Sequence, residues 1–201
     1  MCLRGGWINA YLAIGKIGVI TTMRADDTRD RVLAAAEARL ARHGFHGTSF
    51  RDLAQDVGIR SASVHYHFPT KADLGRAVAD RYTDRFLEDL GDPAAPGTSG
   101  RAKLEKLVAA FREAALHERR MCLCGLLGSE REGLPEPVQG SVARFFERLL
   151  AWLEGAFGEG PQARARALNV VATLEGALLL AHALQDPDLY DQAVAPLLDE
   201  R

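Results

Sequence analysis

The chain has 201 residues, of which 47% are hydrophobic and 26% charged, and its formal net charge is −2. These values are typical of a globular protein of one or two domains. They exclude a globally basic nucleic-acid-binding protein, so any DNA-binding function must rest on local features. Three cysteines, Cys2, Cys122 and Cys124, are too few for the disulfide framework of a small secreted protein and suit a reducing cytoplasm.

The chain opens with an apolar stretch, WINAYLAIGKIGVI, at residues 7–20. This stretch is shorter than the ~20 apolar residues that cross a bilayer, and glycines and Lys16 interrupt it. We expect residues 1–22 to be an extension outside the fold, translated ahead of a natural start at Met23. The alternative is an apolar arm that docks on the body of the protein or on a partner.

Beyond this extension the pattern predicts an all-α fold, since Ala, Leu, Arg and Glu dominate and strand-like alternation is absent. Capping residues and apolar residues four positions apart predict helices over 26–44, 48–58, 61–68 and 70–90. A loop rich in Gly and Pro follows at 91–100. After the loop we expect helices near 101–120, 122–132, 136–157, 161–185 and 187–199.

The two short helices on either side of Gly58 form a helix–turn–helix pattern. Ala54 is small enough for the second helix to cross the first closely, and Gly58 supplies the left-handed backbone that the turn needs. The second helix of this pattern lies in the major groove of DNA. Its segment SASVHYHF carries short or rigid polar side chains that suit bases and phosphates, whereas Phe68 is expected to turn inward. The ring of Tyr66 is expected to be partly buried, with only its hydroxyl outside.

The segment from Arg31 to Leu74 resembles the TetR family of transcriptional regulators. The resemblance is carried, in order, by GFHGTS, RDLA, VGI, SVHYHF and KADL. It implies an all-helical homodimer in which a small molecule binds the C-terminal domain, changes the separation of two DNA-reading heads and usually releases a pseudo-palindromic operator. The family's DNA contacts map onto Thr48, Arg51, Ser61, Ser63, His65, Tyr66, His67 and Lys71. Arg60 replaces a commoner small polar residue, and it either reads DNA or is a solvated turn residue.

The resemblance divides the chain into functional units. These are a helix–turn–helix DNA-binding domain, a connecting helix with its linker, and a helical ligand-binding and dimerisation domain, at residues 23–75, 76–100 and 101–201. The segment at 167–184 is apolar nearly all round, so we expect it to be buried on most faces. The resemblance implies that the helices at 161–199 form the dimer interface, and the alternative is a helix in the core of a monomer. Glu175 on this segment is expected to pair with an arginine, and the alternative is a role in orienting a ligand.

The segment HERRMCLCGLLGSE holds Cys122 and Cys124. Their spacing is incompatible with a disulfide in a helix, and with His117 they lack a fourth metal ligand, so no metal is expected. We expect two buried structural cysteines. The alternative is a thiol sensor, best placed at Cys122, which requires partial exposure and a pKa lowered by Arg119 and Arg120.

We therefore expect a cytoplasmic, homodimeric repressor that leaves its operator when a small-molecule or thiol-reactive effector binds, with no cofactor and no membrane partner. One alternative is an enzyme that uses a cysteine nucleophile with His117 or His182 as base. Another is a DNA-binding protein without an effector. The effector pocket is expected to combine apolar side chains with a few polar ones. The candidates are Phe111, His117, Met121, Cys122, Cys124, Phe145, Trp152, Leu168, Val171, Glu175 and Leu178.

Overall fold

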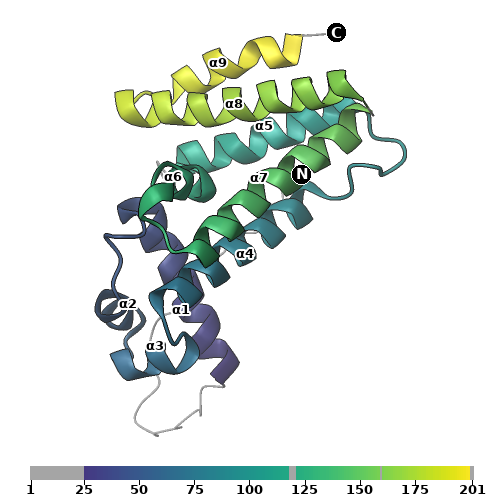
Figure 1. Ribbon diagram of the computed structural model, residues 1–201. Helices are drawn as coiled ribbons and strands as arrows, with labels where there is room; N and C mark the ends of the chain where they lie inside the picture. The colour runs from purple at the N-terminus through teal and green to yellow at the C-terminus, as the bar shows by residue number, and fades with distance from the viewer. Residues whose placement is uncertain (1–24, 118–120, 159, 200–201) are drawn as a thin grey trace, which may run out of the picture.

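The computed structural model describes residues 25–117, 121–158 and 160–199, and all regular structure in these residues is helical (Figure 1). The all-α prediction is therefore confirmed, and each described helix begins and ends within one turn of its predicted bounds. The expectations for residues 1–22, for Arg119 and Arg120, and for the side chain of His117 lie outside the described residues. The helices are α1 (Ala25–His43), α2 (Phe50–Val57), α3 (Ser61–His67), α4 (Lys71–Leu90), α5 (Gly100–His117), α6 (Leu123–Ser129), the 3-10 turn η1 (Arg131–Gly133), α7 (Glu136–Phe157), α8 (Pro161–Leu184) and α9 (Asp188–Asp199).

Helices α1, α2 and α3 form a small unit at one end of the molecule (Figure 1). Its core contains Leu53, Val64 and Phe68, each exposed by 2% or less, so the inward orientation predicted for Phe68 is confirmed. Gly58 ends α2 in the left-handed conformation, with φ 73° and ψ 37°, as the tight turn into α3 requires. The side chain of Ser49 accepts the backbone N–H of Asp52, which confirms the predicted cap of α2.

Helix α4 leaves this unit and runs beside α7 in the C-terminal part of the fold (Figure 1). A capping box between Thr70 and Asp73 starts it, as predicted. Further along α4, two ion pairs one turn apart join it to α7. Asp80 contacts Arg144 at 2.8 Å and Asp84 contacts Arg148 at 2.6 Å. Both pairs are exposed, so each contributes only about 0–1 kcal/mol to stability.

The C-terminal helices are held together by buried polar contacts as well as apolar packing. Tyr190 of α9 is fully buried and donates its hydroxyl to the carbonyl of Val108 in α5 at 2.8 Å. Arg112 of α5 forms a two-point contact with Asp191 of α9 at 2.6 and 2.7 Å. The indole N–H of Trp152 donates to the carbonyl of Gly91 at 2.6 Å, so this side chain anchors the start of the loop at residues 91–99 to α7.

One face of α8 remains exposed in the single chain, contrary to the expectation that this helix is buried on most faces. Its exposed leucines are Leu168, Leu179, Leu180 and Leu184, at 48%, 55%, 51% and 64% exposure. Of the described helices, α8 alone is long and apolar enough to cross a membrane, with a mean hydropathy of 1.6 and 39% of that segment buried. The placement of Leu168 in an internal pocket is wrong, because this position lies on the side of α8 that faces away from the core.

Candidate DNA interface and effector site

The outer surface of the helix–turn–helix is formed by polar and aromatic side chains of α2 and α3. His65 and Tyr66 are exposed and His67 is half-buried, while Val64 between them and the core is fully buried. The expectation of a partly buried Tyr66 ring is wrong, since this ring is 78% exposed. The reason is geometric, because two residues along a helix turn the side chain about 200° away from Val64.

The rings on this surface support one another. His65 lies edge-on to Phe50 of α2, with 4.6 Å between ring centroids, and Tyr66 lies edge-on to His67 at 5.1 Å. The other predicted DNA contacts on this surface are also accessible to a partner. These residues are Arg51 and Arg60, which are exposed, and Ser61 and Ser63, which are half-buried.

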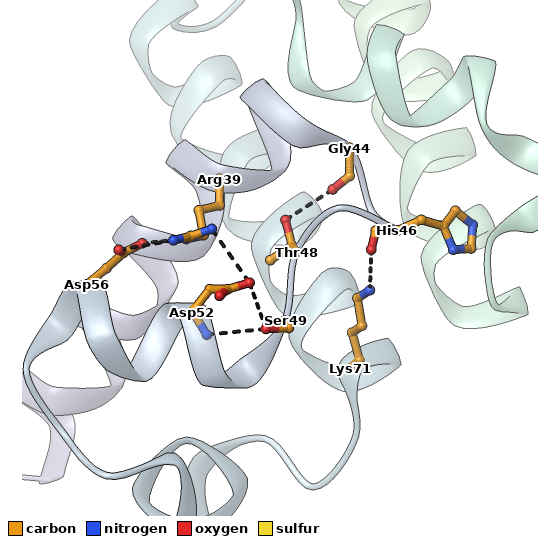
Figure 2. A network of polar contacts seen from close by, with 8 residues as sticks. All are labelled: Arg39, Gly44, His46, Thr48, Ser49, Asp52, Asp56 and Lys71. Atoms are coloured by element: carbon orange, nitrogen blue, oxygen red, sulfur yellow. Dashed lines mark hydrogen bonds and ion pairs between the residues drawn. The ribbon is translucent and has the colours of Figure 1, made fainter.

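Thr48 does not belong to this surface, and its predicted role as a DNA contact is wrong. Thr48 is only 2% exposed, and its hydroxyl donates a hydrogen bond to the carbonyl oxygen of Gly44 at 3.0 Å (Figure 2). Its backbone N–H donates to the carbonyl of Phe45 at 3.3 Å. Thr48 therefore closes the turn between α1 and α2, which leaves no donor for a phosphate.

Lys71 also points differently from the expectation of a phosphate contact at the start of α4. Its ammonium lies 4.5 Å from the centroid of the Phe45 ring. It also lies 3.5 Å from the carbonyl oxygen of His46 (Figure 2). Partial burial lowers the pKa of Lys71, and the charge of Glu130 opposes this shift. In this conformation Lys71 braces the same turn, and it would have to rotate outward to meet a phosphate.

An ion-pair network joins α2 of the helix–turn–helix to α1. Arg39 of α1 contacts Asp56 at 2.5 Å and Asp52 at 3.7 Å, and Asp52 also accepts the hydroxyl of Ser49 (Figure 2). The hydrogen bond from Arg39 lowers the pKa of Asp56. The network fixes the position of α2, and through Gly58 it fixes where α3 begins.

A second candidate site lies where α8 meets α6. Both carboxyl oxygens of Glu175 are buried, and among the described residues only the weakly donating Cys122 thiol is a hydrogen-bond neighbour of this group. The predicted pairing of Glu175 with an arginine is therefore wrong for the described part of the chain. Burial raises the pKa of Glu175, an effect that the neighbouring Cys122 thiol partly opposes. The carboxyl group lies directly over Gly125, so that a Cβ added to this glycine would be 2.3 Å from Oε2.

The two cysteines of this region are buried, with Cys122 exposed by 2% and Cys124 by 0%. Cys122 caps α6, since its sulfur accepts the N–H of Gly125 at 3.4 Å and the hydroxyl of Tyr82 at 3.8 Å. Burial, followed by the charge of Glu175, raises the pKa of both thiols. The structure thus agrees with buried structural cysteines and lacks the exposure and lowered pKa that a thiol sensor requires.

The enzyme alternative gains no support from this geometry. Of the histidines whose side chains are described, none is hydrogen-bonded to either thiol, and His182 is exposed on α8. In the described part of the chain, no three His, Cys, Asp or Glu side chains come close enough together to hold a metal ion.

An aromatic cluster adjoins the buried thiol and carboxyl groups. Tyr82 stacks on Phe86 at 6.0 Å, and Phe145 lies within 5.7 Å of both rings. Phe111 meets Phe86 edge-on at 5.6 Å. The sequence analysis named Phe111 and Phe145 but missed Tyr82 and Phe86, because the pocket was sought only beyond residue 101. The regular four-residue spacing of Tyr82 and Phe86 on the predicted helix at 70–90 was the available signal.

The remaining pocket candidates divide into two groups. Val171 and Leu178 are buried on the same side of α8 as Glu175, and Met121 is half-buried just before Cys122. Trp152 lies about two turns beyond Phe145 on α7, and its N–H is already engaged by Gly91. Contacts of Tyr82 and Phe86 therefore link four of the candidates, Phe111, Cys122, Phe145 and Glu175. Leu168 is exposed, and the N–H of Trp152 is engaged elsewhere.

Comparison with known proteins agrees with this arrangement. Residues 32–78 match the family described as bacterial regulatory proteins, tetR family. The chain is similar to the HTH-type transcriptional repressor KstR2 of Rhodococcus jostii, with 32% identity over 101 residues, which cover 47% of this chain and half of that protein. A TetR transcriptional regulator from Legionella pneumophila is 33% identical, with a TM-score of 0.78 and coverage of 83% of this chain and 92% of that chain. A TetR-family regulator from Agrobacterium tumefaciens is 28% identical, with a TM-score of 0.81 and coverage of 88% and 98%.

Proposed function

Because the chain belongs to the tetR family of bacterial regulatory proteins, we propose that it is a cytoplasmic, homodimeric transcriptional repressor whose operator binding is released by a small molecule. The observation that carries this function is the exposed surface of α3, held in place by α1 and α2. Exposed polar and aromatic side chains on a short helix that follows a tight turn are what a recognition helix needs.

The proposed DNA contacts fall into two kinds. His65, Tyr66 and His67 have rigid rings with polar tips, which suit phosphates at little entropic cost. Arg60, the N-cap residue of α3, is proposed to contact base edges. The remaining proposed contacts are Arg51, Ser61, Ser63 and, after rotation, Lys71.

The proposed dimer forms through α8 and α9. The exposed leucines of α8 are a reason for this choice, because a row of large apolar side chains on one helix face is typical of a protein interface. Burial against a second α8 also accounts for the high hydropathy of this helix without a membrane. Two heads related by a two-fold axis then bind two half-sites of a pseudo-palindromic operator.

Effector binding is proposed at the cluster of Tyr82, Phe86, Cys122, Phe145 and Glu175. Helix α6 connects this cluster to the DNA-binding unit, because its N-cap is Cys122 and its C-cap is Glu130. Glu130 in turn contacts the turn between α1 and α2. An effector that moves α6 therefore changes the position of the recognition helix, and a coupling of about 1–3 kcal/mol suffices for regulation.

The test is a gel-shift with the DNA that flanks the protein's own coding region. The wild-type protein is expected to bind as a dimer, with affinity that falls steeply with salt because it contacts phosphates. The variant Tyr66→Ala should bind much more weakly at unchanged stability. Absence of any specific DNA complex would overturn the proposed function. Binding that no small molecule releases would instead favour the effector-independent alternative.

A further inference from the structure

Among the described residues, the carboxyl group of Glu175 has only the weakly donating Cys122 thiol as a hydrogen-bond neighbour, and this is unusual for a buried ionisable group. Both oxygens are shielded from solvent, and neither has a nitrogen or oxygen donor in that part of the chain. A buried carboxyl group without donors is unfavourable, so such groups are normally hydrogen-bonded or paired with a cation. Among the described residues the site therefore offers no strong hydrogen-bond donor, and a ligand can supply one.

The surroundings of Glu175 favour a positively charged donor. The titratable groups that interact with it are Tyr82 of α4, Cys122 and Cys124 of α6, and Tyr190 of α9. All four are neutral when protonated and become negative when they ionise. Burial is the main cause of the raised pKa of each, and a negative charge on Glu175 adds to it. An anionic ligand would add another negative charge to this region, whereas a cation would balance the carboxylate.

The apolar side of the site is aromatic. Tyr82 reaches the sulfur of Cys122 and stacks on Phe86, which contacts Phe111 and Phe145. Aromatic faces attract cations and also receive apolar groups. A carboxyl group beside a cluster of rings therefore suits an amine attached to an apolar, preferably aromatic, body.

We propose that the effector of this protein is an arylalkylamine whose protonated nitrogen donates hydrogen bonds to Glu175 while its apolar body packs on the ring cluster. The inference rests on the proposed regulatory function and names the chemical class of its effector.

The geometry also links this binding to regulation. Gly125 is so close to the carboxyl group that the added Cβ of any other residue would meet Oε2 at 2.3 Å. An ammonium group thus reaches the carboxyl oxygens only when α6 shifts or Glu175 turns away from α6. The amine consequently favours a conformation in which α6 has separated from Glu175.

The experiment measures binding calorimetrically to the full-length protein without DNA. Three phenylalkyl chains of increasing length are compared as the primary amine, the matching alcohol and the matching carboxylate. We expect the amine of at least one length to bind about tenfold more tightly than its alcohol, and the carboxylate not to bind. Amine and alcohol binding equally, or no amine binding at any length, would overturn the proposal.

Two variants separate a binding role of Glu175 from a structural one. Glu175→Gln keeps the shape and removes the charge, and it should abolish the preference for amine over alcohol while alcohol binding persists. Glu147→Gln makes the same change at an exposed position of α7 and should behave like the wild type. Thermal unfolding of both variants establishes that they are folded.

Proton release gives a second measurement. Burial raises the pKa of Glu175, so binding of an ammonium group should lower this pKa and release any proton that the carboxyl group holds; the binding heat should therefore depend on the ionisation enthalpy of the buffer more strongly for the wild type than for Glu175→Gln. Unchanged amine preference in Glu175→Gln would overturn the proposal. A wild-type protein that binds its operator but ignores every amine contradicts this inference alone, whereas one that binds no DNA contradicts the proposed function.

Discussion

The carboxylate of Glu130 accepts the backbone N–H of Phe45 at 2.9 Å, and this bond joins the C-terminal end of α6 to the turn that precedes the helix–turn–helix. The same carboxylate occupies the space beside Gly44, where a Cβ would overlap Oε1. Helix α6 therefore contacts the proposed effector site at Cys122 and the DNA-binding unit at Glu130.

Replacing Glu130 by Ala should weaken the coupling between the two units. Loss of a carboxylate that satisfies a backbone N–H typically costs about 1–3 kcal/mol of stability. The position of the DNA-binding unit should also depend less on the position of α6. Operator titrations with and without a bound amine are expected to differ less for this variant than for the wild type. Glu132→Ala, at an exposed position of η1, is the control and should retain the full difference. An undiminished effect in Glu130→Ala would show that the signal takes another route.

Gly125→Ala should mimic the effector. The new methyl group would overlap the carboxyl group of Glu175, so either this side chain turns away or α6 moves from α8, and we expect operator binding to fall in the absence of any ligand. The double variant Gly125→Ala/Glu175→Ala removes the overlapping group and should restore most of the binding. Gel-shifts of the two single variants and the double variant provide the comparison. Additive losses in the double variant would contradict the mechanism.

Tyr66 and Thr48 should respond to substitution in opposite ways. Tyr66→Ala removes an exposed ring, so stability should change by no more than ~0.5 kcal/mol while affinity falls for every DNA sequence. Thr48→Val leaves the buried carbonyl of Gly44 without its donor and should cost about 1–3 kcal/mol of stability. Thermal denaturation and DNA titration of both variants distinguish the two roles.

Replacing Arg60 by Ala should alter the preference of the protein among operator sequences. An unchanged preference would exclude base reading by this residue.

Dimerisation should be sensitive to charge on the exposed face of α8. Leu179→Glu places a carboxylate on the proposed interface, where its desolvation opposes association, and sedimentation should show a monomer with weakened operator binding. Ala151→Glu makes a comparable change on an exposed position of α7 and should remain a dimer. If Leu179→Glu also sediments as a dimer, the subunits meet elsewhere.

The buried thiols should react slowly with N-ethylmaleimide. Burial raises the pKa of Cys122 and Cys124, so the thiolate fraction near neutral pH is smaller than for an ordinary cysteine. Labelling, measured in a Cys2→Ser background, should be slow in the folded protein and fast after denaturation. It should accelerate only at pH values above the range in which an exposed cysteine becomes reactive. Rapid labelling of the folded protein with loss of DNA binding would revive the thiol-sensor alternative.

The features that sequence analysis predicted correctly depend on local chemistry. Ser49, Gly58 and Thr70 mark helix ends because capping and left-handed backbone are properties of a few adjacent residues. The inward orientation of Phe68 follows similarly from the absence of any polar group on its side chain.

The incorrect predictions concern which side of an element meets another part of the chain. Tyr66 is exposed although its ring is expected to be partly buried, and Thr48 is buried although it is expected to contact DNA. Both outcomes depend on how α3 and the turn between α1 and α2 pack. Leu168 lies outside because α8 has its buried face on the opposite side. Glu175 lacks an arginine partner among the described residues, and such pairing depends on distant segments that spacing along one helix does not report.

The ion pairs between α4 and α7 repeat at the same interval as the helix itself. Asp80, Asp84 and Glu88 lie four residues apart on α4, as do Arg144 and Arg148 on α7. If α4 slid by one turn, the two arginines would meet Asp84 and Glu88 instead, so the charges alone do not distinguish the two alignments.

Gly75 does distinguish them. An added Cβ at this position would be 2.9 Å from the ring of Phe45 and 3.0 Å from Val138 of α7, so the two helices meet where α4 has its single glycine. A slide of one turn would bring Lys71 or Ala79 to this place, and the Cβ of either residue would press on Phe45 and Val138. Gly75 therefore favours the observed alignment of α4 with α7 over the alignment one turn away.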